Sequence, residues 1–99
     1  MLKIDMQSEG ATLTVKLEGR LDTTTAPELE SELSRNLDGV KELNFDFTDV
    51  EYISSAGLRV LLYAQKTMNQ QGEMKLTGVS DTVKEVFEVT GFSDILTVE

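Results

Sequence analysis

The sequence contains no cysteine and no histidine, and these two absences exclude much of the chemistry by which small proteins act as enzymes. Without cysteine the chain can form no disulfide, no zinc–thiolate site and no thiol nucleophile. Without histidine it has no Ser-His-Asp triad, no imidazole base and no histidine-ligated metal. We therefore expect a domain that is not an enzyme and that needs neither a metal nor a cofactor.

Basic residues are also scarce. Nine lysines and arginines stand against eighteen aspartates and glutamates, which gives a net charge of −9. Repulsion from phosphate groups argues against nucleic acid or an anionic membrane as a direct partner. No apolar run approaches the ~18 residues of a membrane span, and no basic-then-apolar leader is present. We expect a cytoplasmic domain.

The chain is long enough for one domain with a single core, and we expect that domain to cover residues 1–99. Alternating apolar residues predict a hairpin of two strands near residues 2–6 and 13–17, with a turn at Glu9-Gly10. Thr25-Ala26-Pro27-Glu28 has the form of a capping box and predicts a helix that ends near Gly39.

The second half of the chain continues this alternation of strands and helices. Strands are predicted near residues 41–47 and 73–77, and helices over 55–71 and from Ser80 to Gly91. Residues around Ile95 and Thr97 form a short final strand or an extended tail. The order is therefore β-β-α-β-α-β-α-β.

This order predicts an α/β fold, because strands joined through helices run parallel by right-handed crossovers. We expect a four- to five-stranded mixed sheet, with an antiparallel N-terminal hairpin, then parallel strands, and helices mainly on one face. Sites tend to lie beyond the carboxyl ends of such strands. The loops there, residues 22–24, 49–55 and 78–80, should converge on one edge.

Ser54 and Ser55 stand where the third strand passes through a short acidic turn into a long apolar helix. A hydroxyl at that place lies beside unpaired backbone N–H groups and the positive end of the helix dipole. An added phosphate would be well tolerated there. Residue type alone favours a helix cap for Ser55, so the functional question is whether Ser55 also accepts phosphate.

The segment over residues 46–58, which ends in Ser54-Ser55-Ala56-Gly57-Leu58, resembles the signature of the STAS domain. It is most similar to the stand-alone anti-sigma-factor antagonists of bacteria. Gly19-Arg20-Leu21-Asp22 matches the other recurrent motif of that family. Element order and length agree from end to end, so the resemblance covers essentially the whole chain.

The resemblance implies a role in partner switching that controls transcription. In this family an unphosphorylated antagonist binds an anti-sigma factor, usually a serine kinase, and thereby frees a sigma factor. The kinase phosphorylates the antagonist and the complex falls apart, and a metal-dependent phosphatase of the PP2C type resets it. The partners expected for this chain are therefore an anti-sigma factor/serine protein kinase and that phosphatase.

The resemblance also assigns residues. The acceptor position is Ser55, with Ser54 as the less favoured choice. The partner-binding positions are Asp22, Thr23, Thr24, Ser54, Gly57 and Leu58. The family often has aspartate where this chain has Ser54, and serine can replace it as a cap but not as a charge.

Two other readings compete with this one. The first is a STAS-type scaffold or sensor domain that binds a nucleotide or other small ligand in the cleft, without sigma-factor regulation. The second takes Asp46, Asp49 and Glu51 as a magnesium site or an acid/base pair. A solvated strand end and turn is the favoured interpretation of these carboxylates, because no histidine or basic residue completes a catalytic arrangement.

Overall fold

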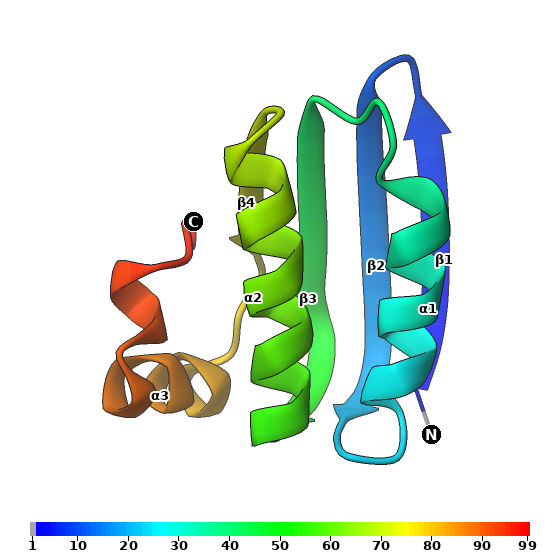
Figure 1. Ribbon diagram of the computed structural model, residues 1–99. Coiled ribbons are helices and arrows are strands. Elements are labelled where there is room, and N and C mark those ends of the chain that lie inside the picture. Colours follow the sequence, from blue (N-terminus) through cyan, green and yellow to red (C-terminus); the bar gives the residue numbers. More distant parts are fainter. Residues whose placement is uncertain (1) are drawn as a thin grey trace.

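The computed structural model describes residues 2–99 and contains one four-stranded sheet in the order β1-β2-β3-β4 (Figure 1). The strands are β1 (Leu2–Glu9), β2 (Thr12–Leu21), β3 (Glu42–Ile53) and β4 (Glu73–Thr77). The helices are α1 (Ala26–Asn36), α2 (Ser55–Asn69) and α3 (Asp81–Thr90), followed by the 3-10 turn η1 (Phe92–Asp94). β1 pairs antiparallel with β2, and the other two pairs are parallel, which confirms the predicted mixed sheet.

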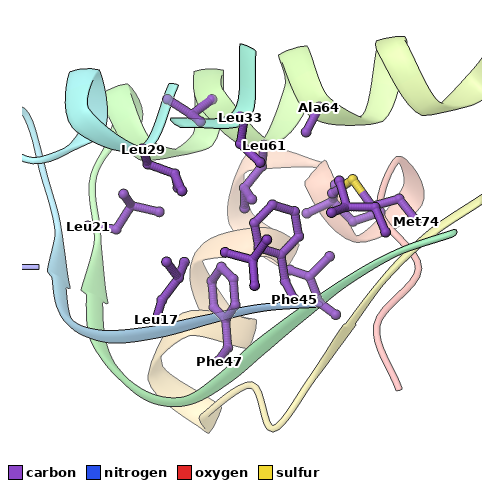
Figure 2. Close-up of a cluster of buried hydrophobic side chains, with 14 of the residues drawn as sticks. Leu17, Leu21, Leu29, Leu33, Phe45, Phe47, Leu61, Ala64 and Met74 are labelled. Atoms are coloured by element: carbon purple, nitrogen blue, oxygen red, sulfur yellow. The ribbon is translucent and has the colours of Figure 1, made fainter. Parts of the chain in front are cut away.

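Helices α1 and α2 lie side by side on one face of the sheet (Figure 1). The strands alternate between buried apolar and more exposed polar residues, as in the first part of β3, where Leu43, Phe45 and Phe47 are fully buried. Figure 2 shows Phe45 and Phe47 from the sheet pointing into the same interior as Leu29 of α1 and Leu61 of α2. The core therefore fills the layer between the sheet and these two helices.

The chain ends beside β4. Ser80 caps α3, since its Oγ accepts a hydrogen bond from Val83 N at 3.3 Å, and Gly91 ends the helix with φ +83°. Beyond η1, Leu76 of β4 forms an isolated parallel bridge with Val98. The last residues thus form an extended tail that pairs at one position, which is one of the two forms expected for them. None of the helices in residues 2–99 has the length and apolar character needed to span a bilayer.

The third strand is longer than the sequence predicts. It was expected to end at Phe47 before an acidic turn, yet β3 continues to Ile53. After Phe47 the buried positions are Val50 and Ile53, a spacing of three where a regular strand has two. The register with β2 shifts twice over this part, which breaks the alternation that identifies a strand in a sequence. The acidic residues 49 and 51 therefore lie on a bulged strand.

Candidate functional site

The first turn of α2 is anchored to the end of β2. The backbone N–H of Ser54 donates a hydrogen bond to the carbonyl of Leu21 at 2.9 Å. Gly57 lies in the first turn of α2 and is buried against Leu21 and Ile53. It has no side chain that would hold the helix away from the sheet. These contacts place the serine pair beside the loop that follows β2.

Ser54 is the N-cap of α2. Its backbone is extended, with φ −98° and ψ 176°, and its Oγ accepts from the N–H of Gly57 at 3.3 Å. The side chain is half-buried. This confirms the capping role predicted for Ser54, and it leaves the neighbouring hydroxyl free of that task.

Ser55 is the first residue of α2, and its side chain is exposed. Within residues 2–99 its Oγ forms no hydrogen bond. α2 also has no acidic residue in its first turn, whereas α1 has Glu28 and α3 has Asp81 there. The positive end of α2 therefore has no carboxylate of its own helix beside it, and the Ser55 hydroxyl stands at that end, open to solvent.

The loop after β2 is organised by the carboxylate of Asp22. Its Oδ1 accepts from the backbone N–H of Thr24 at 3.0 Å and of Thr25 at 3.1 Å. The hydrogen bond from Thr25 N is the main reason that the pKa of Asp22 lies below its ordinary value of 3.8, and the N–H of Thr24 and the charge of Arg20 act in the same direction. Asp22 is therefore ionised at neutral pH and holds the loop in a tight turn.

Thr25 closes this loop and does not cap α1, so the predicted capping box is wrong. Its backbone is already helical, with φ −95° and ψ −23°, and its side chain forms no cap hydrogen bond. The buried hydroxyl donates to the carbonyl of Arg20 at 2.8 Å and accepts from Asp22 N at 2.9 Å. Pro27 does lie in the first turn of α1, as predicted.

Arg20 and Tyr52 extend the site onto the strands. The two residues are register partners across β2 and β3, and the Arg20 guanidinium lies 4.4 Å from the centre of the Tyr52 ring. Arg20 Nε is also 3.8 Å from Asp22 Oδ2, and both Arg20 and Tyr52 are exposed. Sequence reasoning did not single out this pair, although a tyrosine two residues before the serine pair was a signal for it.

A shallow groove of about 360 Å³ runs between the N-terminal parts of α1 and α2, next to the serine pair. Its walls combine small apolar side chains with one acidic and one basic residue, and they comprise Thr23, Ala26, Pro27, Glu30, Ala56, Arg59 and Val60. Arg59 is exposed and lies one turn after Ser55. This residue was also missed by the sequence analysis.

The structure thus brings part of the predicted set together on one surface: Asp22, Thr23, Thr24, Ser54 and Ser55. Gly57 and Leu58 face inward and are buried. The third loop expected at this edge, residues 78–80, lies against Thr48 instead, at a point that β3 passes well before it reaches Ile53. Two loops, and not three, therefore build the serine surface.

Asp46 and Asp49 of β3 each lie against a neighbouring polar or basic group. Asp46 Oδ1 accepts from the hydroxyl of Thr48 at 2.6 Å, and this bond is the main reason that the pKa of Asp46 is lowered. Asp49 lies 3.9 Å from Lys16 Nζ. No group of three acidic side chains within residues 2–99 is arranged to hold a metal ion.

A larger depression of about 910 Å³ lies beside β1, β2 and β3, and its charged lining is mostly acidic: Lys3, Glu18, Glu28, Asp49 and Glu51. Such a lining repels the phosphates of a nucleotide. It therefore does not favour the reading of this domain as a nucleotide sensor.

The model of the STAS domain family matches residues 3–99, and the chain belongs to that family. It is 38% identical to BtrV of Bordetella bronchiseptica over 98% of this chain and 85% of BtrV. It is 34% identical to the anti-sigma-B factor antagonist of Staphylococcus aureus, over 98% of this chain and 92% of that protein.

Solved structures show the same fold. The unphosphorylated form of the anti-sigma factor antagonist SpoIIAA superposes with a TM-score of 0.78 at 18% identity, covering 98% of this chain and 87% of SpoIIAA. The phosphorylated form of SpoIIAA from Bacillus gives a TM-score of 0.77, also at 18% identity, covering 98% of this chain and 91% of SpoIIAA.

Proposed function

We propose that this protein is an anti-sigma-factor antagonist, a non-catalytic module that acts in the cytoplasm. In its unphosphorylated form it binds an anti-sigma factor, and phosphorylation of Ser55 releases that partner. The observation that carries the proposal is the exposed hydroxyl of Ser55 at the first position of α2, beside the ordered Asp22 loop. The 34% identity to the anti-sigma-B factor antagonist of Staphylococcus aureus supports the same assignment.

The two serines have different roles, since Ser54 caps the helix and Ser55 is exposed. Ser54 Oγ is engaged with Gly57 N and is half-buried, whereas Ser55 Oγ is exposed. A kinase needs a hydroxyl that it can reach and orient for in-line attack on the γ-phosphate of ATP. Ser55 meets this requirement with no loss of the helix cap, which supports Ser55 as the acceptor.

Phosphate on Ser55 has a mild effect on the free protein. It adds about −1.5 to −2 charges at neutral pH. The positive end of the helix dipole stabilises this added charge by roughly 1 kcal/mol. No first-turn carboxylate of α2 opposes it. The similar TM-scores to unphosphorylated and phosphorylated SpoIIAA, 0.78 and 0.77, show that this fold exists in both states in that protein.

The same phosphate has a severe effect at an interface. A partner that covers Ser55 must desolvate the new dianion close to the ionised carboxylate of Asp22. Desolvation of such a dianion at an interface costs on the order of several kcal/mol, and each ~1.4 kcal/mol lowers the affinity tenfold. A group that is tolerated in the free protein and opposed in the complex acts as a reversible switch.

Two other proteins add and remove the phosphate. The bound anti-sigma factor is itself the serine kinase, and it transfers the γ-phosphoryl group of ATP to Ser55 Oγ while its catalytic base takes the hydroxyl proton. A PP2C-type phosphatase hydrolyses the phosphoserine and restores the binding form. This domain supplies the acceptor and the surface, since it has no histidine or cysteine for catalysis of its own.

Binding of the anti-sigma factor from the same organism tests the proposal, measured by calorimetry without ATP. Ser55→Ala should bind as well as the wild type, because the hydroxyl itself makes no structural hydrogen bond. Ser55→Glu should bind at least about 30-fold more weakly, since a single carboxylate costs roughly 2 kcal/mol there.

Ser93→Glu is the matched control, because it adds the same charge at an exposed serine of η1. It should bind like the wild type. Equal affinities of Ser55→Glu and the wild type would overturn the proposal, and so would an equal loss in Ser93→Glu and Ser55→Glu.

A further inference from the structure

Arg59 lies four residues after Ser55 on α2, and both side chains are exposed. Residues at this spacing share one face of a helix, with Cβ atoms about 5–6 Å apart. Side chains on a helix lean toward its N-terminus, so a long side chain at position 59 can extend in the direction of Ser55. The geometry of α2 therefore puts a guanidinium within reach of a group attached to Ser55 Oγ.

The guanidinium of Arg59 is also not engaged by another side chain among residues 2–99. Of the three arginines, Arg20 contacts Asp22 and Tyr52, and Arg35 forms an ion pair with Glu32 at 2.6 Å. Within residues 2–99, Arg59 has neither an ion pair nor a stacking contact. Its nearest acidic neighbour in the groove is Glu30 of α1, across the gap between the helices.

We propose that Arg59 is the intramolecular partner of the phosphate on Ser55, which it binds through its guanidinium fork. This inference rests on the proposed function in taking Ser55 as the modified residue. A phosphoserine presents three acceptor oxygens, and the planar fork of arginine matches two of them in parallel hydrogen bonds. The order is also favourable, with the anion nearer the helix N-terminus and the cation one turn later.

The pairing changes the groove as well as the serine. In the unphosphorylated protein Arg59 is a wall of the groove between α1 and α2, together with Thr23 and Glu30. In the phosphorylated protein the Arg59 guanidinium forms an ion pair with the phosphate. Phosphorylation therefore adds negative charge at Ser55 and also withdraws the one basic side chain that lines the groove.

The test uses the full chain with phosphoserine inserted at position 55 during translation, so that no kinase is needed. The second pKa of the phosphate is followed by ³¹P NMR, against a usual value near 6. A bound guanidinium favours the dianion and lowers this pKa. Replacing it in Arg59→Gln should raise the phosphate pKa by roughly half a pH unit.

Arg35→Gln is the matched control, because Arg35 is also an exposed helical arginine but lies in the last turn of α1. It should leave the phosphate pKa unchanged. An unchanged pKa in Arg59→Gln would overturn the inference, as would an equal rise in both variants. A kinase that modifies another residue would instead overturn the proposed function and leave this result standing.

Discussion

The backbone of Gly57 lies directly against Leu21. A Cβ atom on Gly57 would be 2.8 Å from Leu21 Cγ and 3.0 Å from the Leu21 carbonyl oxygen. That same carbonyl accepts the hydrogen bond from Ser54 N at 2.9 Å. Leu21 therefore fixes both sides of the first turn of α2, and the position of Ser55 between Ser54 and Gly57 depends on this close approach.

Gly57→Ala should destabilise the protein. The new methyl would overlap Leu21 and also Ile53 Cγ1 at 2.8 Å, so the helix must move away from the sheet. Overpacking of this kind costs about 1–3 kcal/mol, and the better helix propensity of alanine returns up to about 1 kcal/mol. Urea unfolding should show a net loss of stability in the variant.

Lys66→Ala, on the exposed side of the same helix, is the control and should lie within about 0.5 kcal/mol of the wild type. If Gly57→Ala were as stable as the wild type, α2 would not approach β2 as closely as described.

Thr25→Val should destabilise the loop that faces the serine pair. Valine has nearly the same shape but no hydroxyl, so the carbonyl of Arg20 and the N–H of Asp22 lose their partner. Thr25 is 7% exposed, and unpaired groups in such a place cost roughly 1–3 kcal/mol. The measurement is the free energy of unfolding in urea.

Thr25→Ser keeps the hydroxyl and is the matched control, with an expected loss below that of valine. The hydroxyl would have no structural role if serine were as damaging as valine at this position.

Asp22 should make the stability depend on acidity. Because hydrogen bonds lower its pKa in the folded state below 3.8, its contribution is fully present above that value and is lost as the pH falls through the folded-state pKa. Asp22→Asn keeps an oxygen acceptor for Thr24 N and Thr25 N but does not titrate. Between pH 6 and pH 2.5, chemical unfolding should show a smaller loss of stability in this variant than in the wild type.

Asp38→Asn is the control for this acid titration, because Asp38 is exposed and accepts no side-chain hydrogen bond among residues 2–99. It should lose as much stability on acidification as the wild type. The reverse ranking of Asp22→Asn and Asp38→Asn would contradict the role given to Asp22.

Much of this fold could be predicted from the sequence, because the elements concerned follow regular periods. The hairpin and the first half of β3 alternate strictly, and Ser54 and Ser80 precede helices as caps usually do. The placement of Asp22 beside the serine pair was expected as well, since both follow neighbouring parallel strands.

The incorrect sequence-based predictions also have physical causes. The second half of β3 resembles a turn in the sequence because bulges against β2 change the spacing of its buried residues from two to three. Thr25 and Glu28 fit the capping-box pattern, but a threonine hydroxyl can bond upstream as well as downstream, and the sequence does not say which. Arg59 was missed because its importance depends on what the other arginines already contact.

We propose that Ser55, and not the capping Ser54, offers its hydroxyl to a kinase. The most direct measurement is mass spectrometry of the protein after incubation with its cognate anti-sigma factor and ATP, alongside Ser54→Ala and Ser55→Ala. We expect one phosphate on Ser55 in the wild type and in Ser54→Ala, and none in Ser55→Ala. Phosphate on Ser54 or elsewhere in the wild type, with Ser55 unmodified, would contradict it.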